Sequence, residues 1–164
     1  MAFVPCEPML GLQPFDEVST TQQHPLGTIV RGRDPTHGAG EFIYLEGVAS
    51  TIAGSGVTYS ANTFQTALAS IVGGTTQNIA IALAATVADR YGWYQIAGRA
   101  TVAKASATSF AAAAALGITS GLAVAAATNK RLTNAVVAQA TSAGALTTAI
   151  VAINRPGVSP AAET

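Results

Sequence analysis

Large apolar residues alternate with small or polar ones between residues 79 and 102. A strand places successive side chains on opposite faces, so this period of two predicts two β-strands. The connection between them is expected at 89–92, where Asp and Gly accept turn geometry at little cost. The segment therefore predicts a β-hairpin. One face of its first strand would carry Ile79, Ile81, Leu83 and Val87, and one face of its second would carry Tyr94, Ile96, Ala100 and Val102.

Other short segments after residue 40 are also typical of strands. Residues 41–48, 57–59, 135–139 and 149–153 are rich in β-branched and aromatic or alternating apolar side chains, and glycine or polar turns separate them. Residues 62–70 fit either a short helix or a poorly alternating strand. Counted together, these segments give seven to nine short strands. The pattern predicts an all-β fold, a small barrel or sandwich.

The alanine-rich stretch at 107–116 supports two interpretations. Alanine has the highest helix propensity, which favours a helix over these residues. Against this, glycines recur at Gly117 and Gly121, and apolar side chains at Ile118 and Leu122 lie at even positions. We therefore favour short strands joined by glycine turns over a helix.

Five of the seven prolines lie within residues 1–40. Proline fixes φ and lacks an N–H donor, so we predict an extended arm at 1–40, a β-rich domain at 41–156 and an exposed tail at 157–164. Fully stretched, the arm would span on the order of 100 Å, enough to reach a neighbouring subunit. Packing of the segment along its own domain is the alternative.

Charged residues are scarce. They make up 10% of 164 residues, and eight basic side chains balance eight acidic ones. Binding to nucleic acid needs clustered Lys and Arg, so the composition argues against it. A neutral surface rich in small residues is typical of a protein that covers much of its surface with other subunits, which predicts a homo-oligomer.

Targeting and membrane signals are missing from the sequence pattern. The N-terminus lacks the basic start and apolar run of a signal peptide, and the single cysteine, Cys6, cannot form an intrachain disulfide. Both features favour assembly in the cytoplasm. Residues 105–128 are uncharged, but they are mostly Ala, Ser, Thr and Gly. We therefore expect no membrane span.

Few residues of the sequence are placed to form a catalytic or metal site. The two histidines, His24 and His37, lack a second ligand at zinc spacing. Glu41 and Glu46 are five residues apart on one predicted strand, so they face opposite sides and cannot act as an acid–base pair. We expect no metal, no cofactor and no enzymatic activity.

Aromatic and arginine side chains give candidates for a protein interface. If Tyr94 and Ile96 face the core, then Trp93, Gln95 and Arg99 form an exposed surface of a composition enriched at interfaces. Trp93 as a cap on the barrel end is the alternative. Apolar side chains of the arm complete the set. The candidate interface residues are Phe3, Leu10, Phe15, Trp93, Gln95 and Arg99.

Three segments of the chain resemble parts of a known family. They read Gly-Glu-Phe-Ile-Tyr-Leu-Glu-Gly-Val at 40–48, Gly-Trp-Tyr-Gln-Ile-x-Gly-x-Ala at 92–100 and Val-x-Ile-x-Arg-Pro at 151–156, within an Ala/Gly/Thr-rich second half. Together they resemble the capsid decoration, or cement, proteins of tailed bacteriophages. The resemblance covers the layout of roughly residues 27–156.

This resemblance implies a virion structural protein assembled in the host cytoplasm. Such proteins are compact, β-rich and often homotrimeric, and they sit on the capsid exterior, where they bridge neighbouring major capsid protein subunits. The proline-rich arm departs from the shortest members and leaves open whether the arm or the β-domain makes the main capsid contact. We expect the arm to clamp adjacent capsid subunits while the domain trimerises.

A trimeric receptor-binding or fibre-tip module of a phage virion is the alternative function. It would need exposed aromatic side chains as a carbohydrate platform, and the chain has one tryptophan and four tyrosines. The small number of aromatic side chains favours the decoration protein.

Overall fold

The computed structural model describes residues 4–5, 11–70, 77–127, 131–144 and 147–158. These residues form strands and turns without a helix, which confirms the predicted all-β class. Accordingly, none of the described segments is a helix that could cross a bilayer. The strands are β1 (Val4–Pro5), β2 (Val18–Ser19), β3 (Ile29–Asp34), β4 (Gly38–Glu46), β5 (Gly56–Tyr59), β6 (Thr66–Leu68), β7 (Asn78–Ala82), β8 (Tyr91–Ala103), β9 (Leu116–Thr119), β10 (Leu122–Ala125), β11 (Leu132–Val137) and β12 (Thr148–Val158).

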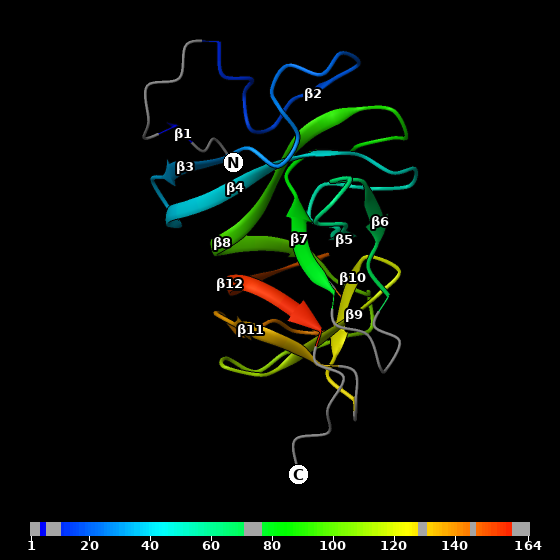
Figure 1. The fold of residues 1–164 in the computed structure, drawn as a ribbon. Helices are drawn as coiled ribbons and strands as arrows, with labels where there is room; N and C mark the ends of the chain where they lie inside the picture. The colour runs from blue at the N-terminus through cyan, green and yellow to red at the C-terminus, as the bar shows by residue number, and fades with distance from the viewer. Residues whose placement is uncertain (1–3, 6–10, 71–76, 128–130, 145–146, 159–164) are drawn as a thin grey trace.

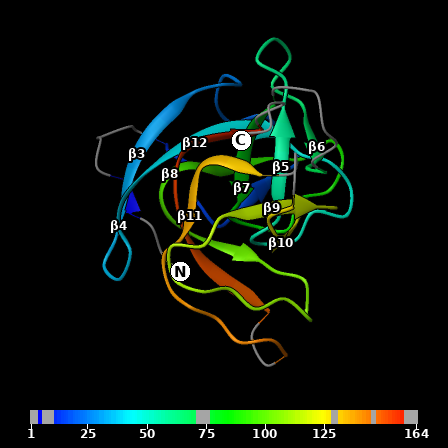
Figure 2. The same cartoon turned by 90° about the horizontal axis from the view of Figure 1, so that it is seen from below.

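Ten of these strands form one antiparallel sheet that curls into a half-barrel (Figure 1). Its main path runs β1-β3-β4-β8-β12-β7-β5-β6, with β2 added to β8 and β11 added to β12. Figure 2 shows the curl from below, with β3 and β4 on one side and β5 and β6 on the other. The pair β9–β10 forms a separate small sheet.

The strand β8 is the longest and lies at the centre of the sheet. Its first half pairs with β4 and β2, its second half pairs with β12, and it also meets β7. The predicted hairpin is therefore present as β7 and β8, with Ile81 opposite Gln95. The connection between them is longer than the predicted turn, because β7 ends at Ala82 and β8 starts at Tyr91.

Both faces of β7 are buried, which explains its mixture of isoleucine and alanine. Ile79 and Ile81 belong to one apolar cluster, whereas Ala80 and Ala82 belong to another. The strand lies within the curled sheet, so the alanine face also needs small apolar side chains. Val87 lies beyond the strand and is exposed.

The alanine-rich stretch contains no helix, so the helix considered for 107–116 is wrong. Residues 107–115 form turns and a single bridge between Phe110 and Thr141. The strands β9 and β10 follow, joined at Ser120 and Gly121, where Gly121 has a φ of +77°. Short strands joined by a glycine turn are thus confirmed for this region. The ambiguous segment at 62–70 contains the strand β6.

The predicted arm at 1–40 is wrong for the part that the structure describes from residue 11 onward. Here β3 pairs with β4 along six residues, and β4 begins at Gly38. The inward positions of β3 are Val30, Gly32 and Asp34, so the strand shows no apolar alternation in the sequence. A Cβ at Gly32 would lie 2.9 Å from the rings of Phe15 and Phe42, which explains the glycine.

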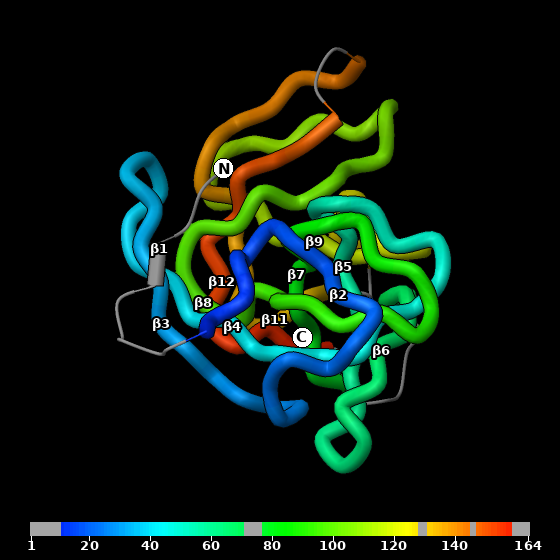
Figure 3. Tube along the Cα trace, turned by 90° about the horizontal axis from the view of Figure 1, so that it is seen from above, coloured from blue at the N-terminus to red at the C-terminus, as the bar shows by residue number. Residues whose placement is uncertain are grey.

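The N-terminal segment at 11–28 packs on its own domain, as the alternative interpretation held. Figure 3, viewed from above, shows this blue segment running across the end of the half-barrel. Phe15 is buried there in an aromatic cluster with Phe42, Tyr44 and Trp93. At the other terminus, β12 extends to the buried Val158, so the predicted tail begins later than residue 157.

Replacing Phe15 by alanine tests whether this segment belongs to the core. Because the ring is 3% exposed and packs against other rings, Phe15→Ala should lower the free energy of unfolding by about 3–5 kcal/mol, measured by urea denaturation. Ile52→Ala is the control, since Ile52 is 52% exposed and should cost less than about 0.5 kcal/mol. Equal stability of the two variants would contradict the packing of residues 11–28 on the domain.

Candidate functional site

The aromatic face of β8 is covered by the N-terminal segment. Trp93 and Gln95 are 2% and 1% exposed. The Trp93 indole Nε1 donates a hydrogen bond to the Gln13 carbonyl oxygen at 3.0 Å, and the Phe15 ring meets the indole edge-on. The predicted exposed surface at Trp93 and Gln95 is therefore wrong. Trp93 is a core residue, which is closer to the alternative interpretation.

The polar groups in this aromatic cluster satisfy one another. The Tyr44 hydroxyl donates to Gln13 Oε1 at 2.9 Å, and the Gln13 backbone N–H donates to His24 Nε2 at 3.2 Å. Burial lowers the pKa of His24, which favours the neutral ring that this acceptor role requires. Burial also raises the pKa of the Tyr44 hydroxyl. His24 is thus a structural histidine.

The remaining predicted interface residues separate into three groups. Phe3 and Leu10 lie outside the described residues, and Phe15 is buried. Arg99 is exposed. The structure therefore keeps Arg99 as a surface candidate and removes Phe15, Trp93 and Gln95.

A β-bulge in β8 explains why Arg99 and Trp93 do not share a face. Glu41 and Phe42 are adjacent in β4 and point to opposite faces, yet their partners in β8 are Ala97 and Gln95, which a regular strand would place on one face. The register shift at this point resolves the conflict. Gln95 stays on the buried face with Phe42, whereas Ala97 joins the outer face with Glu41.

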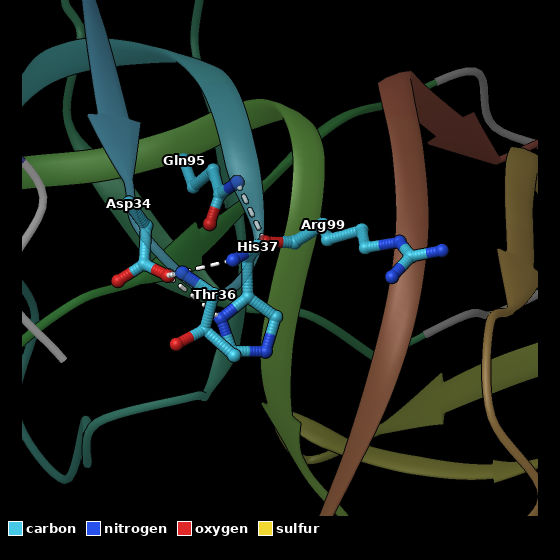
Figure 4. A network of polar contacts seen from close by, with 5 residues as sticks. All are labelled: Asp34, Thr36, His37, Gln95 and Arg99. Carbon is cyan, nitrogen blue, oxygen red and sulfur yellow. Dashed lines mark hydrogen bonds and ion pairs between the residues drawn. The ribbon is translucent and has the colours of Figure 1, made fainter.

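The Gln95 side chain holds the bulge in place (Figure 4). Its Nε2 donates to the carbonyl oxygens of Ala97 at 3.0 Å and Arg99 at 3.1 Å. Gly98 has a φ of +102°, and a Cβ there would lie 2.5 Å from the Ala39 carbonyl oxygen. The bulge thus needs a glycine, and the buried amide fixes the backbone from which Arg99 projects.

Four arginines from three strands lie on the outer face of the sheet around this bulge. We call this surface the arginine face and define it as Arg31 and Arg33 on β3, Arg99 on β8 and Arg155 on β12. It holds half of the eight Lys and Arg residues of the chain. Glu41 lies among them, with its Oε1 3.5 Å from Arg31 Nε and its Oε2 2.9 Å from Arg155 Nη2.

Strand register brings these arginines together from distant parts of the sequence. Arg31 lies opposite Glu41, and Glu41 lies opposite Ala97. In the neighbouring row Arg33 lies opposite Ala39, and Arg99 lies opposite Ala152. Alanines, which carry only a methyl group, therefore lie between the charged side chains. Figure 4 shows the Arg99 side chain running toward β12.

A turn stabilised by Asp34 adjoins the arginine face. Asp34 Oδ1 accepts hydrogen bonds from the backbone N–H groups of Thr36 and His37, both at 2.7 Å, and lies 3.1 Å from His37 Nδ1. Burial alone would raise the pKa of Asp34, but these hydrogen bonds from His37 and Thr36 hold it below its ordinary value. Asp34 is therefore ionised at neutral pH and fixes the connection between β3 and β4.

The described residues offer no metal site, since no three His, Cys, Asp or Glu side chains among them converge. One cavity of about 200 Å³ is lined by Phe15, Leu83 and Gln95 among others, and a more open hollow of about 500 Å³ lies beside Glu17 and Arg90. The described residues that line them include no histidine or cysteine. The arginine face is thus the most distinctive chemical feature of the described surface.

Comparison with known proteins adds no assignment to this picture. No protein-family model, no curated protein and no solved structure matches the chain. The geometry of the sheet and the sequence resemblance are therefore the indications of function.

Two glycine variants test the close approach of β4 and β8 at the bulge. Gly98 and Gly144 have similar φ values, +102° and +100°, but a Cβ meets nothing within 4 Å at Gly144. Both alanine variants should lose about 1–3 kcal/mol from backbone strain. Gly98→Ala should lose about 1–3 kcal/mol more, because its methyl group displaces Ala39. Equal denaturation midpoints for Gly98→Ala and Gly144→Ala would contradict the close approach.

Removing the Asp34 carboxylate should give a pH-dependent loss of stability. Because the pKa is lowered in the folded state, ionised Asp34 stabilises the fold above its ordinary value of 3.8, and this stabilisation is lost as pH falls through the folded pKa. The stability gap between wild type and Asp34→Asn should therefore narrow in urea titrations from about pH 7 to pH 3. Asp16→Asn, at an exposed turn, controls for loss of one charge. A constant gap would contradict this role.

Proposed function

We propose that the protein is a virion structural protein that binds the outside of a tailed-phage head and bridges neighbouring major capsid protein subunits. One observation carries the proposal. The three segments that resemble decoration proteins, 40–48, 92–100 and 151–156, coincide largely with β4, β8 and β12, which are adjacent strands. The resemblance thus describes one contiguous part of the fold.

These segments also supply both faces of the central sheet. β4 pairs with β8 from Glu41 to Glu46, and β8 pairs with β12 from Ala97 to Ala103. Their inward residues include the buried Phe42 and Tyr94, which hold the sheet together. A rigid sheet with a defined outer face is well suited to binding a protein surface, because little conformational entropy is lost on docking.

A decoration protein needs a large contact area with the capsid and several linked binding sites. In this proposal three copies form a homotrimer, and linkage of three modest interfaces multiplies the affinity for a capsid lattice. A protein that binds the assembled lattice better than its separated subunits stabilises the head by mass action. No cofactor and no nucleic acid take part.

The role proposed for the arm now applies to fewer residues. Removal of residues 2–26 would delete Phe15 and the Gln13 carbonyl that accepts from Trp93, so it would damage the core. An arm that clamps adjacent capsid subunits is therefore tested by removing residues 2–10, which also takes away β1, the strand paired with Gly32 and Arg33 of β3.

The described surface does not support the fibre-tip alternative, because the central aromatic side chains are buried. A carbohydrate platform uses exposed rings, whereas the central aromatic residues here are in the core. These buried residues are Phe15, Phe42, Tyr44, Trp93 and Tyr94.

Binding to phage heads tests the proposed function directly. Purified protein should co-sediment with heads that were prepared without it, raise their heat resistance, and add density at regular positions across the shell in electron cryomicroscopy. The reason is that a decoration protein recognises the repeated capsid lattice. The Δ2–10 variant, assayed in parallel, reports the contribution of the arm.

Density confined to a tail or a single vertex would contradict decoration and favour the fibre-tip alternative. Absence of binding by the intact protein would also contradict it. Native mass spectrometry of the free protein checks the trimer separately, and a monomer would contradict that part of the proposal.

A further inference from the structure

We propose that the arginine face docks on a carboxylate-rich surface of the major capsid protein. This inference rests on the proposed function and names the surface and the partner chemistry that it leaves open. It concerns the outer side of β3, β4, β8 and β12.

Positive charge is concentrated on the arginine face. The chain has no net charge and few charged residues, yet four of its eight cationic side chains lie on three strands, β3, β8 and β12, of the contiguous set β3-β4-β8-β12. Two carboxylates lie near them. Glu41 is partly exposed, and Asp34 is buried and accepts hydrogen bonds from the turn that follows β3. The arginine face is therefore positive within a neutral molecule, and it favours an acidic partner.

Two guanidinium groups of the arginine face lack a carboxylate partner among the described residues. The two oxygens of Glu41 are shared between Arg31 and Arg155. Within the described residues, Arg33 and Arg99 form no ion pair. A guanidinium presents five donors in a planar fork that matches a carboxylate, so these two side chains are free to bind carboxylates of a partner.

Hydrogen bonds fix the backbone beneath Arg33 and Arg99. The carbonyl of Arg99 is held by buried Gln95, and Arg33 directly precedes Asp34, whose carboxylate closes the turn after β3. The positions paired with them, Ala39 and Ala152, carry only a methyl group each. A partner surface can therefore approach closely, and docking requires no ordering of the backbone on this side.

The same features favour a protein over a nucleic acid. Four cations would neutralise few phosphates, which gives weak binding to a nucleic acid. Glu41 at the centre of the arginine face would also repel a continuous line of phosphates. Discrete carboxylates, placed to meet Arg33 and Arg99, avoid Glu41.

Single charge reversals test the arginine face. Arg33→Glu and Arg99→Glu should each weaken binding to undecorated heads by about tenfold or more, because each places like charges in contact at the interface. Arg131→Glu is the matched control, since Arg131 is exposed outside the arginine face and carries the same charge change. It should bind as the wild type does. Unchanged melting temperatures establish that all three variants are folded.

A conservative variant refines the test. Arg99→Lys keeps the charge but removes the planar fork, so its binding should fall between that of wild type and Arg99→Glu. Raised salt should weaken wild-type binding more than that of Arg99→Glu, because the variant has lost the favourable charge contact.

Four results would overturn the inference. If wild type, Arg33→Glu and Arg99→Glu bind heads equally, the arginine face is not the docking surface, and the proposed function stands. If Arg131→Glu loses as much affinity as Arg33→Glu and Arg99→Glu, the weaker binding comes from the change in net charge and not from contacts of the arginine face. If wild type retards a DNA duplex at the same salt and the two variants do not, the face binds nucleic acid. If wild type does not bind heads, both proposals are wrong.

Discussion

The bulge between Gln95 and Ala97, followed by Gly98, is the constraint on which the arrangement of the sheet depends. The strand β8 contributes to all three apolar clusters, through Trp93, Tyr94 and Val102 among others. One extra residue in β8 changes which side chains face inward, and the positive φ of Gly98 lets β8 lie against β4. Without this shift, either Phe42 or Glu41 would face the wrong side of the sheet.

The sequence predicts the parts of the fold whose apolar alternation is local. The β7–β8 hairpin, the glycine turn between β9 and β10 and the strands β11 and β12 all follow from nearby residues. The strand β3 could not be recognised in this way, since its inward positions hold Gly32 and Asp34. A ring from a distant segment, Phe15, fills the space above Gly32, and only tertiary structure reveals that contact.

The candidate site was predictable only in part, for the same reason. Arg99 stands out because it lies on the same strand as several aromatic residues. Regular alternation, however, places it on the same face as Trp93. The bulge separates the two, and no local residue pattern except Gly98 signals it. Arg31 and Arg155 join Arg99 through strand register, so residues more than a hundred positions apart meet at Glu41.

The two faces of the central strands have different consequences for association. The N-terminal segment covers the aromatic face within one chain. The Gln13 carbonyl accepts the hydrogen bond from Trp93, and the Phe15 ring packs against the indole. The outer face keeps exposed arginines separated by alanines. Association through that face depends on charge and hydrogen-bond geometry more than on apolar area. Under the proposed docking on the capsid, a partner would therefore be recognised by carboxylates that match Arg33 and Arg99.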